Sequence, residues 1–164
     1  MLLFSQESRQ VESQRLFQKA YASQMKGDLA SAIQLYKRSI SVFPTAEAHT
    51  FLGWTYSFQE RYYEAIDECL RAIELDPDYG NPYNDIGSYL IELNQLKDSV
   101  PWFQKALQAS RYASKVFPWF NLGRVAEWSY DHLQARDCYA RAMEIDPSYL
   151  PAWEAYVRVC AVLN

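Results

Sequence analysis

The residues able to do acid–base, nucleophilic or metal chemistry are few and scattered along the sequence. The two histidines, His49 and His132, are not paired at helical spacing, and the cysteines Cys69, Cys138 and Cys160 lack the spacing of metal ligands. No glycine-rich phosphate loop and no nucleophile elbow is present. The sequence therefore predicts no enzyme active site, no cofactor and no metal site.

One cluster of carboxylates has two interpretations. Asp67 and Glu68 follow Glu64 by three and four residues, so a helix would gather all three on one side. Such a cluster is typical of acid–base chemistry or of a solvated helix face, and we interpret it as the solvent face of an amphipathic helix. His49 is predicted to pack within a helix rather than to act as a base.

A periodic set of small residues organises the rest of the chain. Gly53 and Gly87 are 34 residues apart, and so are Ala72 and Ala106. The pair Leu52-Gly53 returns as Ile86-Gly87 and again at Gly123. A period of this length indicates a stacked array of similar units, each of which buries its apolar face against its neighbours.

Within one period, apolar and small residues recur at three- and four-residue intervals, which predicts helices. Leu16 and Ala20 mark one such stretch, Ala32 and Tyr36 mark the next, and Gly27 supplies the turn between them. Each period is therefore predicted to be a pair of antiparallel helices. A small residue such as Ala20 lets the second helix approach the first closely, because packed helices lie only about 8–10 Å apart between axes.

The order of these residues resembles the tetratricopeptide repeat. Within residues 46–79 the resemblance is carried by Leu52, Gly53, Tyr56, Ala65, Ala72 and Pro77. It extends over roughly residues 13–149 and implies an all-α fold, a right-handed superhelical solenoid of antiparallel helix pairs with an extra C-terminal helix. We expect one domain, made of a lead-in over 1–12, repeats over 13–45, 46–79, 80–115 and 116–149, and a final helix over 150–164.

The resemblance also implies where a ligand would bind, because in this family the first helix of each pair lines a concave groove. Carried over by position, the predicted peptide-binding residues are Phe17, Tyr21, Trp54, Phe58, Asn84, Phe120, Arg124, Trp128 and Arg158. Four of them exceed what the core positions require, namely Trp54, Phe58, Phe120 and Trp128. An apolar strip in a groove indicates a ligand. The alternative is that some of these rings pad an unusually aromatic core.

Polar groove residues suggest finer roles. The amides of Asn81, Asn84 and Asn121 are predicted to bond an extended peptide backbone, since an amide side chain both donates and accepts. Arg124 and Arg158 occupy equivalent positions and would hold one anionic group between them, or else form local ion pairs with Glu127 and Glu154.

One well-known use of the family, clamping the terminal carboxylate of heat-shock chaperones, is not predicted. Those clamps need lysine, asparagine and arginine at set positions. The matching positions here hold Phe17, Tyr21, Phe51, Asn81 and Asp85, and none of them fits.

Charge and cysteine content restrict the partners. The chain has 16 basic and 20 acidic residues, a net charge of −4, which argues against nucleic acid and against an anionic membrane surface as the main partner. An odd number of cysteines and no signal-peptide core or membrane span predict a cytoplasmic protein. The predicted function is a non-enzymatic protein–protein interaction scaffold; the alternatives are a cytoplasmic chaperone for a secreted client and an RNA-binding helical repeat.

The last helix is predicted to carry two apolar stripes. Trp153, Val157 and Cys160 are expected to pack back onto the fourth repeat. The second stripe, Ala152, Tyr156, Val159 and Leu163, would then stay uncovered. This stripe predicts self-association, as a homodimer through the C-terminal helix.

Overall fold

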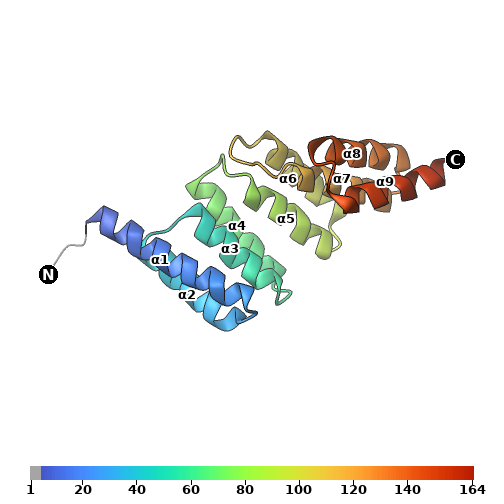
Figure 1. Ribbon diagram of the computed structural model, residues 1–164. Coiled ribbons are helices and arrows are strands. Elements are labelled where there is room, and N and C mark those ends of the chain that lie inside the picture. Colours follow the sequence, from blue (N-terminus) through green and yellow to red (C-terminus); the bar gives the residue numbers. More distant parts are fainter. Residues whose placement is uncertain (1–4) are drawn as a thin grey trace. The chain divides into compact units, whose positions relative to one another are not determined.

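The structure is a computed structural model that describes residues 5–164, and within that range the regular elements are helices (Figure 1). Their bounds are α1 (Gln6–Met25), α2 (Leu29–Val42), α3 (Ala46–Ser57), α4 (Tyr62–Leu75), α5 (Asn81–Glu92), α6 (Leu96–Gln108), α7 (Val116–Trp128), α8 (His132–Ile145) and α9 (Leu150–Leu163). Successive helices pair side by side and antiparallel, α1 with α2 through α7 with α8 (Figure 1). This arrangement confirms the predicted all-α fold of helix pairs with an extra C-terminal helix.

The helices belong to two compact units. Unit 1 ends at Pro77 and contains α1 to α4, and unit 2 begins at Asp78 and contains α5 to α9. The division falls near the boundary predicted between the second and third repeats, while the single domain stays a prediction. Residues 1–4 of the predicted lead-in lie outside the described residues, and the chain is already helical from Gln6, because Ser5 caps α1 by accepting the N–H of Ser8 at 3.2 Å.

The turn inside each helix pair has the same backbone geometry. One residue of each turn has a positive φ: Gly27, Glu60, Asn94 and Tyr130. The next N–H donates to a carbonyl five residues back, as Asp28 does to Ser23 at 3.0 Å and Asp131 does to Ala126 at 2.9 Å. The turn predicted from Gly27-Asp28 therefore recurs in every pair, and hydrogen bonding holds it even where the residue is not glycine.

Close approach within the pairs occurs where the small residues predicted it. A Cβ added to Gly53 would lie 2.8 Å from the backbone oxygen of Ala65. One added to Gly123 would lie 2.5 Å from the ring of Tyr139. The two helices of these pairs can pack at this distance only because the glycine has no side chain.

The third pair is followed by a longer connection than the others. Its second helix, α6, ends at Gln108, and residues 109–115 form a loop before α7. Backbone hydrogen bonds hold this loop: the N–H of Arg111 donates to Asp78 at 2.9 Å, and the N–H of Gly80 donates to Arg111 at 3.2 Å. Those bonds replace the helical ones that a longer α6 would have made.

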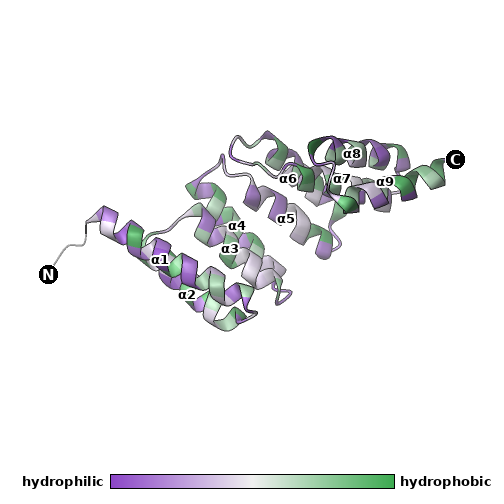
Figure 2. Cartoon of the chain, in the orientation of Figure 1, coloured by the Kyte–Doolittle hydropathy of each residue, from purple (hydrophilic) through white to green (hydrophobic). Residues whose placement is uncertain are grey.

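Small residues and rings fill the core of unit 2. One cluster joins Tyr139 of α8 to Ala155 and Val159 of α9, and another joins Phe103 of α6 to Val125 of α7. The last turns of α9 are coloured as hydrophobic (Figure 2). We define the leading helices as the first helix of each pair together with α9, and their exposed apolar residues include Met25 of α1, Trp128 of α7 and Val157 of α9.

Candidate functional site

An aromatic surface lies on the two leading helices of unit 1. We define it by five residues, Phe17 and Tyr21 of α1 and Phe51, Trp54 and Phe58 of α3 and its C-terminal cap. Their rings touch in sequence: Phe17 to Phe51 at 5.2 Å between centroids, Tyr21 to Phe51 at 5.7 Å, Phe51 to Trp54 at 5.8 Å and Trp54 to Phe58 at 5.2 Å. These contacts, most of them edge-on, join the four predicted residues of unit 1 into one surface.

Much of this surface is open to solvent. Phe58 is 54% exposed and Tyr21 is 39% exposed, while Phe17, Phe51 and Trp54 are half-buried. Met25, one further turn along α1, is 52% exposed. Adjacent exposed rings of this kind are typical of surfaces that bind another molecule.

Phe51 was not among the predicted groove residues, yet it contacts three of the four that were. Its ring also lies 6.3 Å from that of Tyr36 in the core beneath. The sequence held a signal for it, because Phe51, Trp54 and Phe58 follow one another by three and four residues, the spacing of one helix face. The groove positions of the family do not include the position of Phe51, so the resemblance did not predict it.

Gln24 lies in the interior of unit 1, where it is hydrogen-bonded to Tyr36. The hydroxyl of Tyr36 donates to Oε1 of Gln24 at 2.8 Å, and both side chains are buried. Burial raises the pKa of Tyr36, so its hydroxyl stays a donor at neutral pH. Gln24 itself therefore belongs to the interior rather than to a groove.

Unit 1 also buries an acid–base contact that the sequence did not predict. Nδ1 of His49 lies 2.6 Å from Oε2 of Glu68, and Nη1 of Arg71 lies 2.9 Å from Oε1 of the same carboxylate. The assignment of Glu68 to the solvent face is thus wrong, since only 7% of the residue is exposed. The reason is Gly53, whose missing side chain lets α4 approach until Glu68 faces α3. His49 packs within a helix, as predicted.

Unit 2 carries polar residues on its leading helices instead. Nδ2 of Asn121 donates to Oδ1 of Asn84 at 3.3 Å and to Oγ of Ser88 at 3.4 Å. Oδ1 of Asn121 in turn accepts from Nη1 of Arg124 at 3.1 Å. Asn84 is only 9% exposed, which contradicts its predicted contact with a peptide backbone, because the amide is already used inside the unit.

A carboxyl group lies next to this network. Burial raises the pKa of the Asp85 carboxyl to about 7, although a hydrogen bond from Asn84 acts in the opposite direction. The pKa of Tyr112 is also raised, by burial first and by the charge of Asp85 second. Asp85 therefore changes its charge near neutral pH.

The two predicted arginines have different partners. Nε and Nη2 of Arg158 donate to the two oxygens of Glu127 at 2.8 and 2.9 Å, and Tyr139 donates to Glu127 at 2.7 Å. The hydrogen bond from Arg158 holds the pKa of Glu127 below its usual range. The guanidinium of Arg124 instead lies 4.7 Å from the ring centre of Trp128, which is 48% exposed. The two arginines therefore do not share a site, and Arg158 forms the predicted local ion pair.

Phe120 is part of the core and not of an open groove. Its ring lies 5.6 Å from Tyr139 and 5.4 Å from Tyr149, and it packs against the buried clusters of α8 and α9. Of the four surplus aromatic residues, Phe120 thus follows the alternative interpretation, padding of an aromatic core. Phe58 and Trp128 are the two that are exposed.

The stripes of α9 are exchanged relative to the prediction. Ala152 and Val159 are fully buried, whereas Trp153 and Val157, which were expected to pack inward, are 44% and 61% exposed. The cause is packing of Ala155 and Val159 into the core of α7 and α8, which turns the side of α9 that carries Ala152 and Val159 inward. Tyr156 is half-buried and Leu163 is exposed, so the predicted self-association residues do not form one open stripe.

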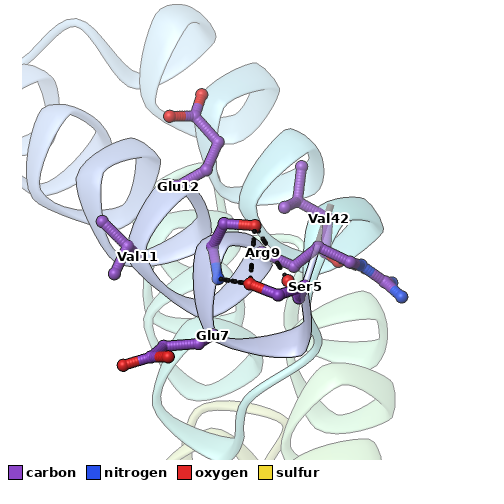
Figure 3. A pocket seen from close by; sticks show the side chains of 7 residues that line it. Ser5, Glu7, Arg9, Val11, Glu12 and Val42 are labelled. Atoms are coloured by element: carbon purple, nitrogen blue, oxygen red, sulfur yellow. Dashed lines mark hydrogen bonds between the residues drawn. The ribbon is translucent and has the colours of Figure 1, made fainter. Parts of the chain in front are cut away.

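A pocket of about 780 Å³ lies at the start of α1 (Figure 3). Arg9 lies in it and donates from Nε and Nη2 to the carbonyl of Val42 at 3.0 and 2.7 Å, which completes the C-terminal end of α2. Glu12, also in its lining, pairs with Arg15 at 2.7 Å. These two charged side chains are engaged within unit 1, so the pocket offers neither of them to a ligand.

Among residues 5–164, no group of three or more histidine, cysteine, aspartate or glutamate side chains is placed to hold a metal ion. No helix in the same range combines the length and the apolar character needed to cross a bilayer.

Comparison with known proteins identifies the repeats. Family models of the tetratricopeptide repeat match residues 46–79 and residues 81–112. The TPR repeat-containing thioredoxin TTL4 of Arabidopsis thaliana is 31% identical over 75 residues, which are 45% of this chain and 11% of that protein. The chain thus matches about a tenth of the length of this curated relative.

Solved structures show the same fold. The structure reported for pilF of Pseudomonas aeruginosa is similar with a TM-score of 0.86 at 17% identity, covering 92% of this chain and 68% of that one. The first TPR of Spaghetti (RPAP3), bound to an HSP90 peptide, is similar with a TM-score of 0.66 at 20% identity, covering 72% and 92%.

Proposed function

We propose that this chain, whose residues 46–79 and 81–112 match models of the tetratricopeptide repeat, is a non-enzymatic interaction scaffold whose aromatic surface binds an apolar protein segment. The observation that carries this proposal is the run of touching rings from Phe17 to Phe58 on α1 and α3. A folded chain gains little from exposing Phe58 and Tyr21 to water. Covering them with a partner removes that apolar area from solvent.

The chemistry of the surface indicates the kind of segment it binds. Its five side chains are aromatic, and the one polar group among the exposed pair is the Tyr21 hydroxyl. Rings present broad, rigid contact area at a small entropy cost, and they anchor leucine, methionine and other aromatic side chains well. Met25 beside them adds a flexible thioether that adapts to different partners.

Selection from a random peptide library displayed on phage, against the immobilised full chain, tests this proposal. Enriched peptides should carry two or more large apolar residues. Phe58→Ala and Tyr21→Ala should each weaken the selected peptide by about tenfold in Kd, the usual effect of removing an aromatic anchor.

The matched control is Tyr63→Ala, because Tyr63 is a 67% exposed ring on α4 of the same unit and lies outside the aromatic surface. It should bind the selected peptide like the unmutated chain. Equal weakening by Tyr63→Ala and Phe58→Ala would overturn the proposed site. The proposed function would be overturned if no library peptide binds the unmutated chain more tightly than it binds the Trp54→Ala/Phe58→Ala double variant.

A further inference from the structure

Arg124 and Arg158 lie one repeat apart in unit 2 and hold their guanidinium groups differently. Arg158 uses the fork made by Nε and Nη2, which grips both oxygens of Glu127 at 2.8 and 2.9 Å. The same fork is used by Arg15 on Glu12 and by Arg61 on Glu64. In this chain, the Nε–Nη2 fork is therefore a recurrent carboxylate grip.

The fork of Arg124 has no such partner among residues 5–164. Its one hydrogen bond within that range goes from Nη1 to the amide oxygen of Asn121. Glu127, one turn further along α7, is occupied by Arg158 and Tyr139. Nε and Nη2 of Arg124 are left for a group from outside the described chain.

The open fork is held in place from two sides. Asn121 is buried and is itself oriented by Asn84 and Ser88, so the acceptor of the Nη1 bond is fixed. Cζ of the Arg124 guanidinium lies 4.7 Å from the centre of the Trp128 ring, a cation–π contact on its other side. A guanidinium ordered before binding loses little further freedom when it forms two hydrogen bonds.

We propose that Arg124 is a specificity-determining residue that binds a carboxylate of an acidic protein segment through Nε and Nη2, with Trp128 packing against the same residue of the ligand. The inference rests on the proposed function, because it assumes that the leading helices bind protein segments. It adds a preference for acidic residues at a site in unit 2, separate from the aromatic surface of unit 1.

The test is an NMR titration of the full chain, following the Trp128 indole N–H and the Arg124 Nε–H. The probe is an acetylated and amidated peptide, Gly-Phe-Asp-Phe-Gly, and the comparison peptide has Asn in place of Asp. At low salt the Asp peptide should shift both signals and bind roughly fivefold more tightly or better, because a charged acceptor strengthens the hydrogen bonds. A version of the Asn peptide with a free C-terminus shows whether a terminal carboxylate can replace the side-chain carboxylate in binding Arg124.

Variants separate the fork from simple charge. Arg124→Gln should remove the preference for Asp, and Arg124→Lys, which keeps the charge but not the fork, should retain less than half of it. Arg136→Gln is the control, since Arg136 is a partly exposed arginine of unit 2 whose fork is already paired with Asp137. If Arg124→Gln does not fold, the Arg124→Lys result decides.

Two results would overturn the inference: equal affinity for the Asp and Asn peptides, or an Asp preference that survives Arg124→Gln. A library peptide that binds unit 1 while these titrations show no Asp preference would sink this inference and leave the proposed function standing. An Asp preference at Arg124 without any peptide binding at the aromatic surface would support this inference and overturn the proposed function of the aromatic surface.

Discussion

Phe51 in unit 1 and Asn121 in unit 2 both lie two residues before the glycine of their repeat, and both are the centre of a network. Phe51 joins Phe17, Tyr21 and Trp54 through ring contacts. Asn121 joins its neighbours through hydrogen bonds to Asn84, Ser88 and Arg124. One repeat position thus produces an apolar surface in one unit and a polar, cation-bearing surface in the other.

The position one residue after the glycine repeats the contrast. It holds Trp54 in unit 1, but Ser88 and Arg124 in unit 2. The repeat constrains the small and apolar residues that pack the pairs, and it leaves these outward positions free to differ. Differences in binding chemistry can therefore accumulate along the array without any change of fold.

The buried polar contacts of the two units also differ, and the largest expected loss of stability is that caused by His49→Ala. Unit 1 buries the His49–Glu68 contact, whereas unit 2 buries the neutral Asn84–Asn121 pair. Removing His49 leaves the buried carboxylate with Arg71 alone, so we expect a loss of about 3 kcal/mol in unfolding free energy. Asn121→Ala should cost about 1–2 kcal/mol.

Urea denaturation measures both losses. Arg71→Ala is the control within unit 1, because the Arg71 side chain is 60% exposed and its ion pair contributes about 0.5 kcal/mol or less. If Arg71→Ala destabilises the chain as much as His49→Ala, the buried contact is not what stabilises unit 1.

Trp54→Ala examines whether the aromatic surface is a binding surface or part of the core. Binding of a library-selected apolar peptide should weaken by about 2 kcal/mol, measured by calorimetry, while the thermal midpoint changes little. Trp119→Ala in unit 2 provides the contrast, since Trp119 packs against a buried cluster. A fall in thermal midpoint as large as that of Trp119→Ala would make Trp54 a core residue.

Asp85→Asn tests how the stability of unit 2 depends on pH. The pKa of Asp85 is raised from 3.8 to about 7 in the folded chain, so between these values the folded chain holds a proton that the unfolded chain has released. Stability from this group is therefore lost as pH rises from about 4 to about 7. Asp85→Asn should flatten that slope and stabilise the folded chain by roughly 3–4 kcal/mol at pH 7, because each unit of pKa shift corresponds to about 1.4 kcal/mol.

Glu127→Gln is its counterpart with the opposite sign. The hydrogen bond from Arg158 lowers the pKa of Glu127, so its contribution to stability is present at neutral pH and is lost as pH falls. The Gln variant should be less stable than the unmutated chain at pH 7. Parallel pH profiles for the two variants would refute both assignments.

Val157→Lys tests whether unit 2 also has an apolar binding face. The sequence predicted self-association through a stripe of α9 in which Ala152 and Val159 are buried, so we propose the exposed face that carries Trp153 and Val157 in its place. Light scattering at micromolar concentration should show a dimer for the unmutated chain and a monomer for Val157→Lys. Because Val157 is exposed, stability should change by less than about 0.5 kcal/mol. A monomer before mutation would exclude this face as a dimer interface.

The sequence alone determined the repeat period, the helix pairs and the glycines at which they approach. These features depend on spacing along one helix and on residue size, both of which can be read locally. The residues 46–79 are matched by a family model over the range predicted for the second repeat. Exposed aromatic residues such as Phe58 could also be predicted, because they exceeded what the core positions needed.

Only the tertiary structure decided which polar and apolar side chains are used internally. Glu68 is buried because α4 approaches at Gly53, Asn84 is engaged because α7 brings Asn121 to it, and Arg158 is paired because α7 places Glu127 beside α9. Each partner lies on another helix, so helical spacing holds no information about it. For the same reason the prediction assigned the wrong stripe of α9 to the core. Both stripes are apolar, and only packing against α8 selects the one that is buried.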